Sequence, residues 1–205
     1  MTALHKQLGV SSNTLWLAPS FFPDIIKHVK RDYAIEGDYP MSTVDVYDMA
    51  TARELRGITQ KKMIEQYHSP LISFSLNIPG PEKDNTLYRK IHRVGEIVIE
   101  KAFAQHIIHR ISQNGKTGPQ AYYAIKMPSP LIKKETVKIE ENHPYGRIFD
   151  IDVIDLQCKP ISREKLNIPG RKCFICEEEA ALCSRSRKHG VEELLQKIHS
   201  IAEML

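Results

Sequence analysis

The sequence predicts an α+β fold, with a mixed or antiparallel sheet covered by two or three long helices. Two observations indicate this class: long segments with the apolar spacing of helices, and short segments with the alternation of half-buried strands, separated by proline and glycine turns. Apolar residues form 41% and charged residues 26% of the 205 residues, so the chain has an ordinary globular composition and can bury a substantial core.

The first forty residues differ from the rest of the chain in their sequence pattern. They hold the only tryptophan, Trp16, and they end in Gly37-Asp38-Tyr39-Pro40, a turn or linker sequence. We therefore expect residues 1–40 to be an N-terminal extension.

Two long helices and a third, C-terminal helix are expected after this extension. The first begins at the capping residue Ser42 and continues through Met63. The second spans Thr86–Ile111 and ends before Asn114-Gly115, since glycine just past a helix relieves the left-handed cap. The third, Val191–Met204, is amphipathic and closes the chain.

Four segments have the residue pattern of strands: Leu71–Leu76, Ala121–Lys126, Glu135–Ile139 and Ile148–Leu156. The turn Glu141–Gly146 is long enough to make Thr136–Glu140 and Arg147–Ile154 antiparallel neighbours. Such a hairpin would bring Glu140 close to the carboxylates of the last strand.

Two aspartates stand one residue apart in that last strand. Because successive strand side chains point to opposite faces, Asp150 and Asp152 share one face, with carboxylates roughly 7 Å apart, from two steps of about 3.3 Å. The pair suits one or two Mg²⁺ ions that hold substrate phosphates, although it is also compatible with the solvated face of an edge strand. Phosphorus chemistry is the first hypothesis, with Glu140 or Asp155 as a further metal ligand.

Three residues just before the aspartates extend this candidate site. Arg147 could bind a phosphate or neutralise an aspartate. Gly146 would let the backbone approach a ligand or take a positive φ. His143 could donate to phosphate or act as a base, although a turn histidine is more often exposed.

A second cluster has the residue types of a zinc site. Cys173, Cys176, Cys183 and His189 follow a C-x2-C-x6-C-x5-H spacing, which offers three thiolates and one imidazole. Half-buried free thiols are also common structural residues, so packing is the alternative.

A basic turn overlaps this cluster just before the last helix. Arg185, Arg187, Lys188 and His189 fall within five residues, and Arg171 and Lys172 extend the same basic surface. Positive charge beside a helix N-terminus favours anion binding, and a solvated charged turn is the alternative.

Composition excludes several classes of protein. The apolar runs are too short to cross a bilayer, and the first residues lack the pattern of a secretory signal peptide, so a cytoplasmic protein is expected. In that location cysteines are more often thiols or metal ligands than disulfides. A net charge of +4 fits an anionic substrate or an acidic protein partner and does not require nucleic acid.

Four blocks of sequence together resemble the family of apo-citrate lyase phosphoribosyl-dephospho-CoA transferases, also called citrate lyase holo-acyl-carrier-protein synthases. The blocks are Ala52-Arg53-Glu54-Leu55-Arg56 with Gln60, Ser73 through Pro81, His143 through Ile154, and Arg171 through His189. Taken alone, the first block is a solvated helix face and Asn77–Pro81 is a turn. The resemblance begins near Met41 and implies a single transferase domain over 41–205.

The resemblance implies transfer of triphosphoribosyl-dephospho-CoA to a serine of the citrate lyase acyl carrier protein, the γ subunit, with release of diphosphate. Metal-bound carboxylates would promote this displacement, with Arg147 as a catalytic residue beside Asp150 and Asp152. The residues expected to bind substrate are Gly146, His143, Arg185, Arg187, His189 and Asn77. The segment Gly146–Asp152 is also similar to the Asp-x-Asp strand of polymerase-β-type nucleotidyltransferases, although a Gly-Ser motif well upstream is missing.

Two alternatives remain open. One is the equivalent transferase of malonate decarboxylase, which performs the same chemistry on another carrier protein. The other is a zinc-containing module that binds RNA through the basic turn, but Phe174 is the only aromatic residue between Arg171 and His189 that could stack on bases.

Overall fold

The computed structural model describes residues 43–203, so the expected N-terminal extension lies outside the described residues. Its helices are α2 (Val46–Tyr67), α3 (Thr86–Ala102), α4 (Ser129–Asn142), α5 (Ala180–Ser186) and α6 (Val191–Glu203), with a short 3-10 helix, η3 (Glu164–Leu166). Its strands are β1 (Leu71–Leu76), β2 (Ile107–Gln113), β3 (Gln120–Ile125) and β4 (Phe149–Ile154). No helix in the described range is long and apolar enough to span a membrane.

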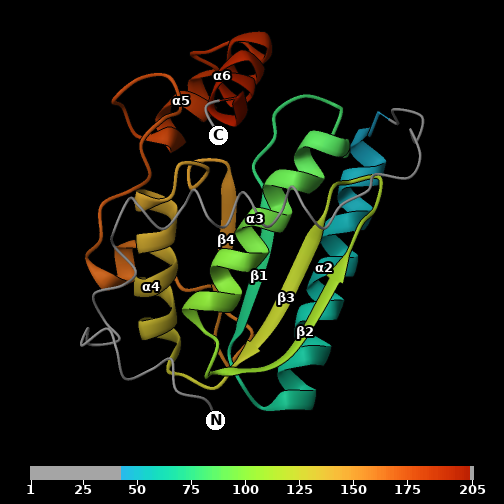
Figure 1. Ribbon diagram of the computed structural model, residues 1–205, viewed down its shortest axis with the longest axis vertical. Coiled ribbons are helices and arrows are strands. Elements are labelled where there is room, and N and C mark those ends of the chain that lie inside the picture. Colours follow the sequence, from blue (N-terminus) through green and yellow to red (C-terminus); the bar gives the residue numbers. More distant parts are fainter. Residues whose placement is uncertain (1–42, 204–205) are drawn as a thin grey trace, which may run out of the picture.

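The four strands form one antiparallel sheet in the order β2-β3-β1-β4, which confirms the predicted α+β class. Helices α3 and α4 pack on one face of this sheet and α2 on the other, while α5 and α6 lie at one end (Figure 1). Strand β4 is an edge strand, so one side of its backbone has no neighbouring strand.

The alternation of strand side chains divides the core between the two faces. Ile72 and Phe74 of β1 lie in the large core under α3 and α4, whereas Leu71 packs with Met63 and Ile64 of α2. The α2 face is apolar only at this end. Farther along β1 the same face carries serines, which leaves a polar region between α2 and the sheet.

Helix α2 begins with a reciprocal cap that holds its first turn. Asp48 N donates to Asp45 Oδ1 over 2.7 Å, and Asp45 N donates to Asp48 Oδ2 over 3.0 Å. The helix ends where His68 takes a left-handed conformation with φ of 48°. The predicted first helix is therefore confirmed, with its cap three residues later than Ser42.

The predicted second helix is wrong beyond Ala102. The chain leaves the helix at Phe103, and Ile107–Gln113 forms β2 against β3. Apolar spacing could not separate the two states, because β2 is a largely exposed edge strand with weak alternation.

The predicted strand Glu135–Ile139 is also wrong, because these residues belong to α4. Ile132, Thr136 and Ile139 follow helical spacing and are buried on one side of the helix. The expected hairpin is consequently a helix followed by a strand, and Glu140 approaches β4 from a helix rather than from a neighbouring strand.

We predict that Gly95→Ala will destabilise the protein by about 1–3 kcal/mol. A Cβ at Gly95 would overlap the ring of Phe74 and come within 3.1 Å of Phe149. Phe74 cannot easily move, because it is buried, stacked on His92 at 4.5 Å and edge-on to Phe149. Urea denaturation would measure the loss.

The matched control is Gly57→Ala on α2, where a Cβ would meet nothing within 4 Å. It should stabilise the protein by up to about 1 kcal/mol, because alanine is the better helix former. Equal effects of the two substitutions would contradict the packing described here.

Candidate active site

Asp150 and Asp152 lie on the α2 face of β4, opposite serines of β1. Ser75 is the partner of Asp150 and Ser73 is the partner of Asp152 in the strand register. Ser75 Oγ donates to Asp150 Oδ2 over 3.4 Å. The residues between and beside the aspartates face the buried core on the other side of the sheet. The two carboxylates therefore share the polar region under α2.

A pocket of about 220 Å³ opens beside Asp150. Its walls come from α2, from the end of β1 with the loop after it, and from the loop before β3. Three lining side chains are basic, Arg53, Arg56 and Lys83, whereas Asp150 is the acidic one. The remaining lining residues are Met49, Ser75, Leu76, Asn77, Ile78, Thr117, Gly118 and Pro119. The pocket is thus polar and predominantly positive.

Arg56 is prepared for an anionic ligand. Its Nε atom is buried and has no hydrogen-bond acceptor among residues 43–203, although the Arg56 side chain also contacts Tyr122. A buried donor without an acceptor costs free energy, so an anion entering from the pocket would relieve that cost. One turn farther along α2, Gln60 Nε2 donates to Ser73 Oγ over 3.0 Å, which ties the helix to the strand opposite Asp152.

The aspartates repel each other. Loss of solvent around Asp152 and, next, the charge of Asp150 raise the pKa of the Asp152 carboxyl, while Lys133 and Arg56 oppose this rise. Asp152 is nevertheless exposed to solvent on this face of the strand. Two neighbouring carboxylates that destabilise each other's charge form a favourable site for a divalent cation.

Side chains and one backbone amide, rather than another strand, satisfy the outer edge of β4. Glu140 Oε1 accepts from Ile151 N over 3.4 Å, and Lys133 Nζ donates to Ile151 O over 3.2 Å. Arg171 Nη2 donates to Phe149 O over 2.7 Å. Farther along the edge, Ile161 N donates to Val153 O over 2.8 Å. These contacts fix the strand that carries the aspartates.

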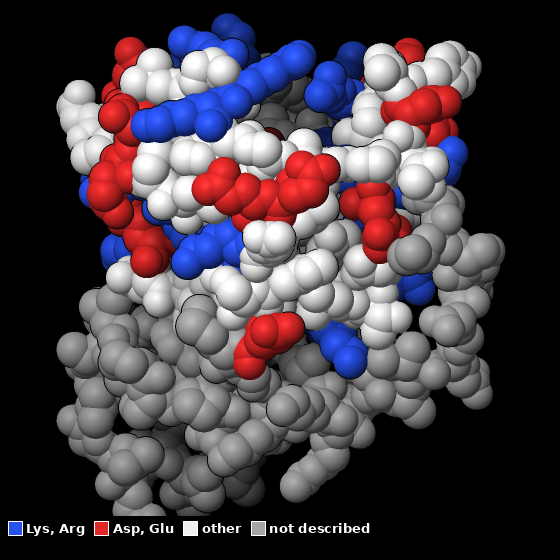
Figure 2. All heavy atoms as spheres, turned by 90° about the horizontal axis from the view of Figure 1, so that it is seen from above, with Lys and Arg blue, Asp and Glu red and all other residues white. Residues whose placement is uncertain are grey.

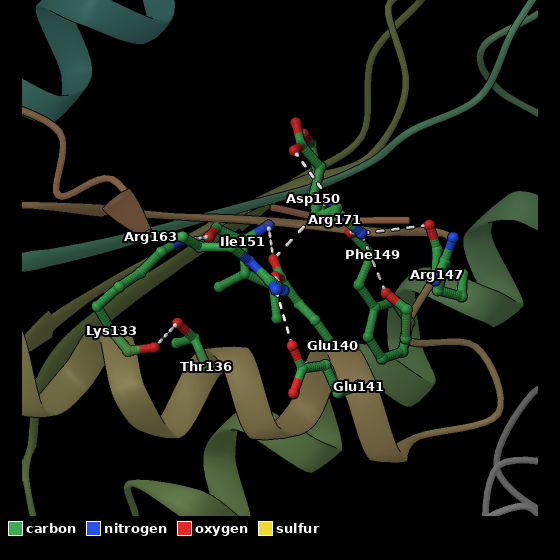
Figure 3. A network of polar contacts seen from close by, with 12 residues as sticks. Lys133, Thr136, Glu140, Glu141, Arg147, Phe149, Asp150, Ile151, Arg163 and Arg171 are labelled. Atoms are coloured by element: carbon green, nitrogen blue, oxygen red, sulfur yellow. Dashed lines mark hydrogen bonds and ion pairs between the residues drawn. The ribbon is translucent and has the colours of Figure 1, made fainter. Parts of the chain in front are cut away.

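Glu140 belongs to this edge network and lies on the opposite side of β4 from Asp150 (Figure 3). It is 3% exposed and pairs with Arg163 over 2.6 Å and with Arg171 over 3.9 Å. Arg171 also reaches Asp150, with 3.8 Å between its Nη1 and Oδ1. Asp155 is engaged elsewhere, because its Oδ1 accepts from two backbone amides of the following turn.

The three residues expected just before the aspartates are built into the α4–β4 junction. Arg147 donates to the carbonyls of Lys172 and Cys173. Gly146 packs so closely on the end of α4 that a Cβ would overlap Glu140 O. His143 is buried and stacked on Phe149 at 5.1 Å, and burial lowers its pKa to about 4. None of the three lines the pocket.

The remaining expected residues divide into three places. Asn77 lines the pocket together with Asp150. His189 lies with Cys173, Cys176 and Cys183 in a separate cluster. Arg185 and Arg187 are exposed on α5 and at its end.

The end of the molecule where α5 and α6 lie is seen in Figure 2. Lys and Arg side chains gather at the upper edge of this view, and Asp and Glu side chains follow in a band below them. The described surface on this side therefore carries both signs of charge rather than one continuous basic field.

Sequence reasoning missed the basic side of the pocket. The sequence alone predicted that Arg53 and Arg56 lie on a solvated helix face, and it gave no reason to assign Lys83 to a site. The available signal was their spacing, since residues three apart on a helix share a face. Only the packing of α2 over the serine end of β1 shows that this face meets a carboxylate.

Fold and site define a class of protein: an α+β domain in which a strand-borne aspartate pair lies beside a basic pocket, an arrangement suited to phosphate-bearing ligands. A family model described as apo-citrate lyase phosphoribosyl-dephospho-CoA transferase matches residues 44–204. The chain belongs to this family, which confirms the resemblance seen in its sequence blocks.

Two relatives illustrate the extent of this similarity. A probable apo-citrate lyase phosphoribosyl-dephospho-CoA transferase of Vibrio cholerae serotype O1 (strain M66-2) is 35% identical over 167 residues, covering 80% of this chain and 94% of the relative. The apo-citrate lyase phosphoribosyl-dephospho-CoA transferase of Citrobacter koseri is 30% identical over 161 residues, covering 77% and 88%.

We predict that Glu140→Gln will lower the free energy of unfolding by about 1–3 kcal/mol, because it removes the buried partner of Arg163 and leaves only the more exposed Glu141, 2.8 Å away, as its counter-charge. Arg163 is 11% exposed in this pair. The control is Glu135→Gln, whose partner Lys138 is 57% exposed and which should cost less than about 1 kcal/mol. Chemical denaturation would compare them, and similar losses would contradict a special role for the buried pair.

Proposed function

We propose that this protein transfers triphosphoribosyl-dephospho-CoA to a serine of the acyl carrier protein, the γ subunit, of citrate lyase, with release of diphosphate. Membership of the transferase family supports the type of reaction and the two substrates. The single structural observation that carries the proposal is the pocket in which Arg53, Arg56 and Lys83 face Asp150. It offers basic groups for a triphosphate next to carboxylates for a metal ion.

The proposed reaction is a displacement at phosphorus. The serine oxygen of the carrier attacks the phosphorus next to the ribose, and a new phosphodiester bond forms. The bond from this phosphorus to the diphosphate oxygen breaks, and diphosphate leaves with that electron pair. The serine proton is released to solvent. The chain therefore has to hold a highly charged leaving group and align the serine opposite it.

In this proposal the basic residues of α2 hold the triphosphate. Arg56 contributes a guanidinium whose Nε lacks an acceptor among the described residues, and Arg53 stands one turn before it. Lys83 approaches from the loop after β1, and its ammonium donates to Ile78 O. Burial lowers the pKa of Lys83, so an anion bound beside it would stabilise its charged form.

Asp150 and Asp152 would hold Mg²⁺, which would neutralise the phosphates and the departing diphosphate. Their shared face and mutual repulsion support this assignment. The same strand-borne pair supports a nucleotidyltransferase-type reaction. Glu140 and Arg147 would act as positioning residues, because both hold β4 or its entry turn from the side away from the pocket.

The direct test incubates the purified protein with triphosphoribosyl-dephospho-CoA, Mg²⁺ and each apo carrier protein in turn. Mass spectrometry should show the citrate lyase carrier gaining the prosthetic group on its serine, together with stoichiometric diphosphate. Modification of the malonate decarboxylase carrier alone would overturn the assignment, and so would modification of neither.

We predict that Asp150→Asn will lower kcat by about a hundredfold or more, the scale expected when one group that stabilises developing charge is lost. Asp152→Asn should behave similarly. Circular dichroism should remain unchanged, because both side chains lie on the polar face rather than in the core. Near-normal turnover by either variant would contradict the metal-binding role.

The location of the triphosphate is tested by a matched pair of arginines. Arg53→Met should raise KM for the precursor about tenfold or more, because a charged hydrogen bond to phosphate is lost. Arg185→Met, on exposed α5, should change KM less than about twofold. The reverse order of effects would place the triphosphate at α5 instead of the pocket.

A further inference from the structure

The most compact group of metal-binding side chains in the described range lies far along the chain from the aspartates. One ligand atom from each of Cys173, Cys176, Cys183 and His189 lies within 4.8 Å of all the others. Cys176 Sγ is 3.5 Å from Cys183 Sγ and 3.4 Å from His189 Nε2. Cys173 and Cys183 are buried, and the other two are half-buried.

We propose that Cys173, Cys176, Cys183 and His189 bind one structural zinc ion. A tetrahedral ion with Zn–S bonds of about 2.3 Å and Zn–N bonds of about 2.0 Å holds its sulfurs about 3.8 Å apart and its sulfur and nitrogen about 3.5 Å apart. The observed separations from Cys176 are close to these values. Four protein ligands close the coordination sphere, as in structural rather than catalytic sites.

The groups around the four ligands suit a bound cation. His189 Nδ1 faces Glu193 Oε2 at 3.4 Å, so a carboxylate can hold the ring proton on Nδ1 and leave Nε2 for the metal. Ile175 N donates to Cys173 Sγ over 3.5 Å, and the backbone of Glu178 bonds to Cys176 in the same way, two residues on. Lys188 Nζ lies 3.9 Å from Cys176 Sγ. These donors would stabilise thiolates.

The remaining cysteine of the chain lies outside this group. Cys158 is exposed on the turn after β4 and takes no part in the cluster. Packing alone can explain why each of these thiols is buried, but it does not explain why three thiols and an imidazole nitrogen from separate turns lie so close together. A shared ion explains the convergence and assigns His189 to the metal rather than to the substrate.

The site would fasten the C-terminal segment to the sheet. Cys183 belongs to α5, His189 precedes α6, and Arg147 donates to the carbonyl of Cys173. Arg171, two residues before Cys173, donates to Phe149 O and pairs with Asp150. Zinc would thus anchor the segment that covers the edge of β4.

The test measures zinc in the full-length protein purified without chelator, by elemental analysis. We expect about one zinc per chain in the wild type and in Cys158→Ser, and almost none in Cys176→Ser or Cys183→Ser. Removal of zinc by a chelator should lower the melting temperature, and added zinc should restore it. Wild-type protein that contains no zinc and is not stabilised by zinc would overturn the proposal.

A second measurement does not depend on the folding of variants. Wild-type protein reconstituted with Co²⁺ should show the strong visible bands of a tetrahedral ion and thiolate charge-transfer absorption, both displaced by one equivalent of Zn²⁺. Weak octahedral bands, or bands that Cys158→Ser abolishes, would contradict the proposed ligand set.

Discussion

The buried ion pair between Glu140 and Arg163 is the contact on which the geometry of the site depends. An edge strand presents unpaired backbone groups that have to be satisfied or covered. Glu140 reaches from α4 to the amide of Ile151, and Arg163 neutralises the carboxylate that does so. Without Arg163 the carboxylate would keep only Arg171, 3.9 Å away, and would be much more costly to bury at this edge. The pair therefore allows β4 to end the sheet and still stay rigid.

Because one side of β4 is held in place, two carboxylates that repel each other can be kept close together on its other side. The outer edge and the α3–α4 face hold the backbone through Glu140, Lys133 and the apolar core, so the register with β1 is fixed. That register sets Asp150 and Asp152 on the opposite face, where their charges oppose each other. A free loop could relax to separate the two carboxylates, but a paired strand cannot. The repulsion between the two carboxylates is therefore located where a bound cation and the phosphates of a substrate can reduce it.

Features of the fold and site that depend on residues close together in the sequence were predictable, whereas those that depend on packing between distant segments were not. Strand β4 and the shared face of its aspartates depend on alternation within six residues, and α2 depends on a local cap and spacing, so both were predictable. Strand β2 and helix α4 were not, because the weak pattern of one and the β-branched residues of the other fit either state until packing decides. The pocket was hidden for a similar reason: Arg56 looks solvated until α2 is laid across the serine end of β1.

Arg171 connects the cysteine cluster to the aspartate pair. It lies two residues from Cys173 and contacts Phe149, Glu140 and Asp150 around the edge of β4. A cysteine cluster that fixes this stretch of chain also fixes a guanidinium at the aspartate pair, without contributing any group to the pocket. The clustering of the cysteines and the charge balance at Asp150 are therefore coupled through a few bonds of backbone. A change in the cysteine cluster should therefore alter the charge balance at Asp150, and the reverse, even though the two sets of side chains share no ligand.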